Sequence, residues 1–267
     1  MPQSLYRSLL DAPEGGGDLP MPFADLEIKG AKFRRGQVAI VGAAPGGGKT
    51  AFITNYCITA VVAQSVSILY YSPDSDIMTI GPRILGTMQA REVRNVFRDF
   101  RKGGTGFDQH LEKAKELGHI QWCFDPAPRP EDVKGELDAF VAVHGHYPDL
   151  IILDNIKDFD PGVGGEGGDH TRHGATVDYF HQMARLTNAA VVLLHHLKGQ
   201  YENSNEPPPL SALLGNISKP ARLVLNLFSE SPEQMGVVIA KNSNGEAHPA
   251  ADQWETLTWN KETQTIY

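Results

Sequence analysis

Short apolar runs alternate along the chain with longer segments whose apolar residues recur at helical spacing. The runs of strand length are Gln37–Gly42, Val66–Tyr71, Ile120–Phe124, Leu150–Leu153, Ala189–Leu194, Leu223–Phe228, Gly236–Lys241 and Thr256–Asn260. Helices are predicted over Thr50–Ala63, Ile77 to about Phe97, Gln109–Leu117, Glu131–Val143 and about Ala175–Thr187. Strands that alternate with helices predict an α/β protein with a mostly parallel sheet and helices on both faces.

Composition narrows the class of protein. The 267 residues include 24 Lys and Arg against 32 Asp and Glu, a net charge of −8, and 41% are hydrophobic. A chain with this apolar fraction can bury a core, which excludes global disorder. Its negative net charge excludes a protein that coats nucleic acid with a generally basic surface. A local basic groove remains open, because phosphate contacts need only a few Lys and Arg. Cys57 and Cys123 lie in apolar surroundings, which argues against a disulfide framework.

No apolar run approaches the ~18 residues of a membrane span, and the N-terminal segment lacks the apolar core of a secretion signal. We therefore expect an intracellular protein with no membrane partner. Residues 1–22 are expected to be a flexible lead-in, since residues 14–22 are rich in Pro and Gly. Residues 23–267 are expected to form a single domain.

The strongest chemical signal is a glycine-rich segment between the first strand and the first long helix. Phosphate oxygens need several converging N–H donors, and a backbone almost free of Cβ atoms can supply them beside a helix N-terminus. The expected nucleotide-binding residues are Ala43, Ala44, Pro45, Gly46, Gly47, Gly48, Lys49, Thr50 and Ala51. In the P-loop motif the lysine binds the β- and γ-phosphates and the hydroxyl holds Mg²⁺. The alternative is a glycine-rich turn with an incidental lysine, and Ala43 stands where the motif has glycine.

Two carboxylates complete the expected site. Asp154 directly follows the buried run Leu150–Leu153, and an Asp in that place is expected to share the Mg²⁺ with Thr50. Asp74 follows the second strand and is the expected base that activates water, in preference to Asp76 because it is nearer the strand end. The alternative for this segment is a turn whose polar side chains cap the next helix, and both roles are compatible.

The order of these parts resembles the RecA-like P-loop ATPase core, and in particular the DnaB-like replicative helicases of phage and plasmid type. The resemblance rests on VGAAPGGGKTAF, YYSPDSD, IILDNI and LLHHLKG, and it extends from about Phe23 to the C-terminus. It implies a twisted, mostly parallel sheet with C-terminal antiparallel strands. It also implies MgATP hydrolysis at subunit interfaces, and a chain without the family's N-terminal collar domain.

The same resemblance implies two further site residues. His196 takes the place of the polar residue that senses the γ-phosphate, although two packed histidines at a sheet end are the simpler interpretation. Lys241 matches the lysine of a Lys-x-Arg that reaches the neighbouring subunit's nucleotide, whereas Ser243 stands where the arginine is expected. Such an arginine contributes ~10³–10⁵ in rate in other P-loop enzymes. Its absence places fast hydrolysis in question unless Lys241 or another arginine substitutes.

The function implied is an ATP-dependent DNA helicase or translocase of DNA replication. Its expected partners are single-stranded DNA, further copies of itself in a ring that is expected to be hexameric, and a replication loader or primase. If the chain is phage-encoded, the resemblance implies the cytoplasm of the bacterial host. Two alternatives stay open: a recombination or repair ATPase that forms filaments on DNA, and a slow nucleotide-gated loader.

Three weaker features have less specific meanings. The segments Asp160–Gly174 and Lys198–Leu213 correspond to channel loops of the resembled fold, but they are poor in positive charge, so polar contacts would have to carry much of the DNA binding. Five basic residues fall along one predicted helix: Arg91, Arg94, Arg98, Arg101 and Lys102. A solvated helix face or a subunit contact explains these residues as well as a DNA-binding surface does. The paired histidines 144/146 and 170/173 lack partnering Cys, which argues against zinc.

Overall fold

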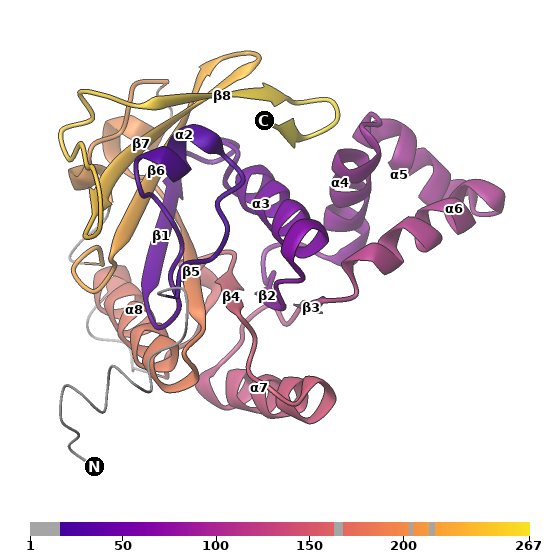
Figure 1. Ribbon diagram of the computed structural model, residues 1–267, viewed down its shortest axis with the longest axis horizontal. Helices are drawn as coiled ribbons and strands as arrows, with labels where there is room; N and C mark the ends of the chain where they lie inside the picture. The colour runs from indigo at the N-terminus through magenta and orange to yellow at the C-terminus, as the bar shows by residue number, and fades with distance from the viewer. Residues whose placement is uncertain (1–16, 163–167, 203–204, 214–216) are drawn as a thin grey trace.

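The computed structural model describes residues 17–162, 168–202, 205–213 and 217–267. Within them one nine-stranded sheet forms the centre of the molecule (Figure 1), with the strand order β3-β2-β4-β5-β1-β6-β7-β8-β9. The strands are β1 (Val38–Ala43), β2 (Ile68–Tyr71), β3 (Ile120–Cys123), β4 (Leu150–Leu153), β5 (Ala190–His196), β6 (Leu223–Ser231), β7 (Gln234–Asn242), β8 (Glu255–Asn260) and β9 (Thr265–Ile266).

Helices cover both faces of this sheet. They are α2 (Ala24–Ile28), α3 (Lys49–Gln64), α4 (Ile77–Gln89), α5 (Val93–Lys102), α6 (Thr105–Ala114), α7 (Pro130–His144) and α8 (Gly168–Thr187). Side chains of β1 alternate between two cores: Ala39 and Val41 pack with α3, whereas Val38 and Ile40 pack with α7 and α8. Helices α4, α5 and α6 project beyond β3 at one side of the molecule (Figure 1).

The direction of the strands changes at β6. Strands β3, β2, β4, β5, β1 and β6 run parallel, whereas β7 is antiparallel to β6, β8 to β7 and β9 to β8. Short turns join β6 to β7 and β8 to β9, and a tight turn can only join antiparallel neighbours. The predicted α/β class, with a mostly parallel sheet and C-terminal antiparallel strands, is confirmed.

Three predicted helices have other bounds in the structure, and the one expected over Gln109–Leu117 is α6, which runs from Thr105 to Ala114. The segment expected as one helix to about Phe97 is two helices, because Ala90 adopts a left-handed φ of 49° and the Arg91 amide donates to the Gly86 carbonyl at 2.9 Å. Such a turn ends a helix and redirects the chain. Helix α8 begins at Gly168, well before the expected Ala175, so the described end of the first expected loop is helical.

The packed part of the chain begins before Phe23. Leu19 and Met21 are buried, and the Leu19 amide donates to the Phe33 carbonyl at 2.8 Å. These apolar residues therefore belong to the core, although Pro and Gly dominate the segment around them. No helix in the described parts of the chain is long and apolar enough to cross a membrane.

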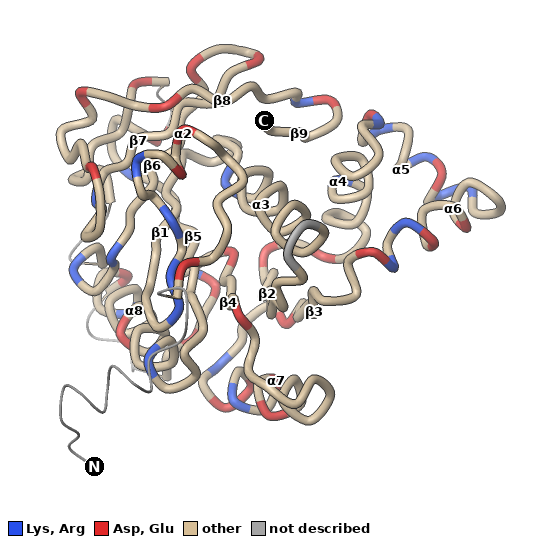
Figure 2. Tube along the Cα trace, viewed as in Figure 1, with Lys and Arg blue, Asp and Glu red and all other residues tan. Residues whose placement is uncertain are grey.

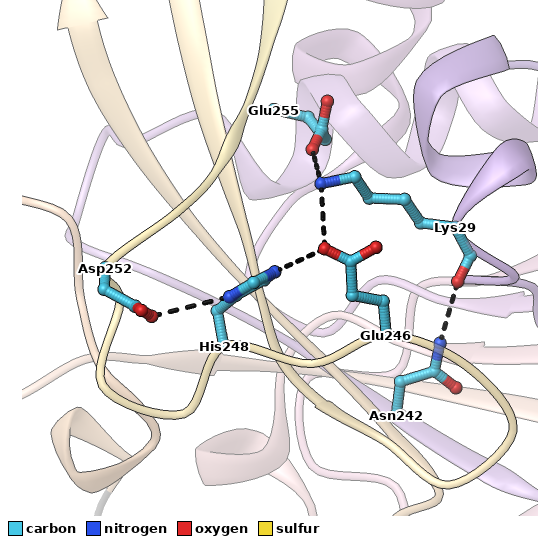
Figure 3. A network of polar contacts seen from close by, with 6 residues as sticks. All are labelled: Lys29, Asn242, Glu246, His248, Asp252 and Glu255. Carbon is cyan, nitrogen blue, oxygen red and sulfur yellow. Dashed lines mark hydrogen bonds and ion pairs between the residues drawn. The ribbon is translucent and has the colours of Figure 1, made fainter.

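A polar network fixes the loop that follows β7 (Figure 3). The Lys29 ammonium pairs with Glu255 at 2.6 Å and with Glu246 at 3.3 Å, and Nε2 of His248 lies 2.8 Å from the same Glu246 carboxylate. Asn242 donates to the Lys29 carbonyl at 3.3 Å. The network ties this loop to the end of α2 and to the start of β8, so the segment carrying Lys241 and Ser243 has a defined position on its own chain.

Candidate nucleotide-binding site

A pocket of about 510 Å³ opens where four parallel strands end. It is lined by residues of the loop after β1, by Asp74 after β2, by Asp154 after β4, and by His196 at the end of β5. Carboxyl ends of neighbouring parallel strands meet at one edge of a sheet, and ligands bind there in open α/β folds. The structure thus brings together four parts of the chain that the sequence singled out separately.

The glycines of the loop have backbone conformations that other residues avoid. Gly46 has a φ of 71° and Gly48 a φ of 90°. Gly48 also lies against two side chains from the antiparallel strands: a Cβ there would collide with the Met235 methyl and lie 3.0 Å from the Trp259 ring. The first turn of α3 follows directly, and the Phe52 amide donates to the Gly48 carbonyl at 2.8 Å. Loop and helix N-terminus together have a backbone arrangement that fits an anion.

We predict that Gly48→Ala will damage the loop far more than Gly46→Ala. Both positions have a positive φ, but a Cβ at Gly46 meets nothing within 4 Å, whereas one at Gly48 overlaps Met235 and crowds Trp259. The shared left-handed strain costs ~1 kcal/mol, and overpacking adds ~1–3 kcal/mol at Gly48 alone. Thermal unfolding of the two variants measures the difference. Equal losses would show that the contacts with the antiparallel strands do not constrain the loop.

Lys49 is the buried cation of the pocket. Its side chain is 6% exposed, and its ammonium donates to Nδ1 of His196 at 3.0 Å and to the Ala43 carbonyl at 3.4 Å. Burial lowers the pKa of Lys49 to about 8, against the opposing attraction of Asp154. A buried ammonium of this kind lacks a sufficient counter-charge, and a phosphate group would provide one. The donor set therefore fits a polyphosphate.

Thr50 and Asp154 form a second pair in the pocket. The Thr50 hydroxyl donates to Oδ2 of Asp154 at 2.7 Å, and the buried Tyr70 hydroxyl donates to the same oxygen at 3.0 Å. Burial raises the pKa of Asp154, and the two hydroxyl donors oppose that shift. Hydroxyl and carboxylate oxygens are the ligands that Mg²⁺ prefers, and it usually takes only one or two carboxylates beside substrate phosphates. This pair fits such an ion.

Asp74 and Asp76 have different places in the turn after β2. Asp74 lines the pocket, is largely exposed, and has Nζ of Lys157 3.9 Å from its carboxylate. Asp76 caps α4 instead, because its Oδ1 accepts from the Thr79 amide at 2.8 Å. Of these two carboxylates, Asp76 caps the helix and only Asp74 lines the pocket.

The two histidines that end β5 face opposite ways. His196 contacts Lys49, and burial, with the nearby Lys49 charge, lowers the pKa of His196 to about 4, so its neutral ring can accept from the ammonium. His195 lies on the other side, 2% exposed, with its ring centroid 5.1 Å from that of His173 on α8. Successive strand residues point to opposite faces, which explains the separation.

Lys241 lies outside the pocket. Its ammonium donates to the carbonyls of Ser218 at 2.8 Å and Lys219 at 3.2 Å, at the end of β7. Ser243 follows, and its amide donates to the Arg222 carbonyl at 2.8 Å. Within one copy of the chain, then, Lys241 cannot act on the pocket that holds Lys49 and Asp154.

Six pocket residues were missed by the sequence reasoning. Ser75 and Asn155 directly follow predicted residues, and the remaining four are Arg83, Trp259, Lys261 and Gln264. Arg83 comes from the middle of α4, and the other three come from β8 and the turn before β9. No local motif marks them, because they reach the pocket through the packing of α4 and of the C-terminal strands. The one sequence feature that could have indicated Arg83 is its place in a predicted helix that follows the turn carrying Asp74.

The described parts of the two expected DNA loops lie close together. Nζ of Lys198 is 3.9 Å from Oδ2 of Asp169, which joins the start of α8 to the segment after β5. Residues 163–167, including Glu166, and residues 203–204 lie outside the described residues. The structure therefore leaves the prediction about DNA contacts untested.

The basic cluster formed by Arg91, in the turn before α5, and by the basic residues of α5 is partly neutralised by its own chain. Arg91 pairs with Asp99 at 3.0 Å and Arg94 with Glu92 at 2.7 Å, while the Arg101 guanidinium lies 4.5 Å from the Phe97 ring centroid. Basic residues predominate on α5, and acidic residues lie among the basic ones along α5 and α6 (Figure 2). This pattern is typical of a solvated surface rather than of a phosphate-binding face.

Comparison with known proteins places the chain among related sequences. A family model described as AAA domain, AAA_25, matches residues 17–200. The Gene 65 protein of Mycobacterium phage L5 is 30% identical over 97% of this chain and 96% of its own length. The Gene 65 protein of Mycobacterium phage D29 is 28% identical over 86% of this chain and 98% of its own.

Solved structures share the fold. One solved ATPase domain superposes with a TM-score of 0.81 at 17% identity, covering 98% of this chain and 95% of that one. A DnaB-like replicative helicase, determined in a study of its interactions with primase, superposes with a TM-score of 0.80 at 18% identity. The match covers 98% of this chain and 66% of the helicase chain. The RecA-like fold expected from the motif order is confirmed.

Proposed function

Because the chain belongs to the AAA_25 family of AAA domains, we propose that it binds MgATP in the pocket after β1 and hydrolyses it. The observation that carries this proposal is the meeting of the buried Lys49 ammonium with the Thr50–Asp154 pair at one strand edge. A triphosphate requires a cation without a sufficient counter-charge, as Lys49 is, and its metal requires oxygen ligands, as Thr50 and Asp154 offer.

Each side chain has a distinct task in this proposal. Lys49 and the loop amides would hold the β- and γ-phosphates, and Thr50 and Asp154 would hold Mg²⁺, which would neutralise charge on those phosphates. Asp74 takes a proton from the attacking water while the oxygen of that water bonds to the γ-phosphorus. The bond between the γ-phosphorus and the β–γ bridging oxygen breaks at the same time, and ADP leaves with the bridging oxygen. His196, in contact with Lys49, reports the γ-phosphate state to the segment that begins at Lys198.

The task that this hydrolysis serves is movement along single-stranded DNA by a DnaB-like helicase, in a ring of identical subunits that acts in DNA replication. The fold shared with a solved ATPase domain and with a DnaB-like replicative helicase supports the proposal. The proposed partners are single-stranded DNA, further copies of the chain, and a replication loader or primase.

Single-stranded DNA should stimulate ATP turnover clearly. A motor couples each step along the strand to a hydrolysis cycle, so its kcat rises when the strand is present. The measurement is steady-state phosphate release with and without oligonucleotide, at low salt because phosphate contacts weaken with salt. Turnover that ignores DNA would contradict the motor.

ATP turnover that is unchanged by DNA would favour a nucleotide-gated loader, in which ATP controls DNA binding and hydrolysis is slow. One observation favours this candidate: Ser243 stands beside Lys241, and Lys241 is engaged by carbonyls of its own chain. DNA binding that depends on ATP, with turnover unchanged by DNA, would identify a loader.

A further inference from the structure

One arginine of the pocket has no role in the function proposed above. Arg83 lies in α4 and lines the same pocket as Lys49, Asp74 and Asp154. Its side chain is exposed, and no hydrogen-bond or ion-pair partner of its guanidinium lies among the residues that the structure describes. It is thus a pocket cation that the described part of its own chain does not neutralise.

The packing of α4 explains how Arg83 reaches this place. Thr87, one turn further along the same face, donates its hydroxyl to the carbonyls of Thr263 and Gln264, each at 3.3 Å. Gln264 in turn accepts from the Asn55 amide of α3 at 2.7 Å, so α4 and the C-terminal turn are both anchored near the loop after β1. Helical side chains point back towards the helix N-terminus. Asp76 caps that end of α4, and the pocket residues Asp74 and Ser75 precede it.

Apart from Lys49, two cations near the pocket already have contacts within the chain. The Lys261 ammonium lies 4.7 Å from the Trp259 ring centroid and donates to the Ser229 hydroxyl at 3.1 Å. Lys157 lies 3.9 Å from both Asp74 and Asp158. Lys49 is assigned to the β- and γ-phosphates in the proposed function, so among the described residues Arg83 is the second pocket cation able to meet charge that a ligand brings.

We propose that Arg83 is a catalytic residue that stabilises the transferring γ-phosphate from within the same subunit, in place of the arginine missing at Ser243. Transfer of the phosphoryl group spreads negative charge over its oxygens, and a guanidinium offers a fork of N–H donors that matches them. An arginine of the same chain supplies this charge in some P-loop enzymes. The inference rests on the proposed ATP hydrolysis.

The rival arginine is Arg222. The registers of β6 and β7 place it directly across from Ser243, since Leu223 pairs with Asn242 and the Ser243 amide donates to the Arg222 carbonyl. Opposite residues of antiparallel strands project from the same face, so Arg222 occupies the place from which a neighbouring subunit's arginine would act. Arg222 does not line the pocket of its own chain.

Three variants separate these possibilities. Arg83→Ala should lower kcat by about 10²-fold, the usual effect of losing one donor to a developing oxyanion, while mant-ATP binds nearly as before. Arg83→Lys should recover part of that loss, because charge returns without the fork. Arg222→Ala should keep the wild-type kcat. An unchanged kcat in Arg83→Ala, or a loss confined to Arg222→Ala, would overturn the assignment.

A transition-state mimic provides a readout other than turnover. Aluminium fluoride should tighten the binding of MgADP to the wild type, and Arg83→Ala should lose most of that gain with plain MgADP binding kept. Thermal unfolding of Arg83→Ala should match that of Arg94→Ala, an exposed arginine outside the pocket, which controls for folding. An equal gain from aluminium fluoride in the wild type and in Arg83→Ala would contradict the proposal.

Mixing two variants with impaired turnover tests whether Arg83 acts within its own subunit. In a mixture of Arg83→Ala and Asp74→Asn no subunit carries both groups, so activity should not recover. If Arg83 acted across an interface, some sites would combine an intact Asp74 with a neighbour's intact Arg83, and recovered turnover would overturn the proposal.

A wild type that binds no ATP would overturn the proposed function and this inference with it, whereas a wild type that hydrolyses ATP beside an unimpaired Arg83→Ala would overturn only the inference.

Discussion

Lys49→Ala should abolish measurable ATP binding while the protein stays folded. The lysine is the buried positive charge of the pocket, and each charge-assisted hydrogen bond to a phosphate contributes about 1.5–3 kcal/mol. Loss of bonds to two phosphates weakens binding by at least about 100-fold. Burial disfavours the charged lysine of the free protein, as its lowered pKa indicates, so its removal should cost little folding free energy.

Calorimetry with MgATP, together with thermal unfolding of the free protein, measures both effects. Lys134→Ala is the matched control, because Lys134 is exposed on α7 and does not line the pocket. Lys134→Ala should bind nucleotide like the wild type. Equal affinity in all three proteins would contradict the phosphate-binding role of this loop.

Asp74→Asn should remove turnover but not binding. The substitution keeps the shape of the side chain and removes its ability to take a proton, and a positioned general base contributes about 10²–10⁴-fold to a rate. Asp74 lies at the pocket rim and is largely exposed, so the folding free energy should hardly change. Single-turnover hydrolysis after confirmed mant-ATP binding isolates this chemical step.

Asp76→Asn is the control for Asp74→Asn. Asp76 caps α4 through the Thr79 amide, and asparagine caps helices about as well as aspartate, so both stability and turnover should be kept. If Asp74→Asn hydrolyses ATP at the wild-type rate, another group must activate the water. If Asp76→Asn loses as much turnover as Asp74→Asn, the turn matters as a whole and neither carboxylate acts as the base.

Features of the nucleotide pocket that depend on neighbours in the sequence could be predicted without coordinates. The glycines before Lys49 and the run of four apolar residues before Asp154 are local patterns, and each states where a strand ends and which side chain follows. Parallel strands then bring those ends to one edge, so Lys49, Thr50, Asp74, Asp154 and His196 were all predicted pocket residues and all line it.

The contributions of remote segments were decided by tertiary contacts alone. Asn55 bonds to Gln264 and Ile266 across 209 and 211 positions, and these bonds bring the C-terminal turn to the pocket. Arg83 reaches the same pocket because its helix packs on that turn. Lys241 lies apart from the pocket, and this too depends on tertiary contacts, because the pairing of β6 with β7 sets the position of Lys241. Chain patterns specify periodicity and element ends, whereas contacts between distant segments depend on how whole elements pack, which no short pattern encodes.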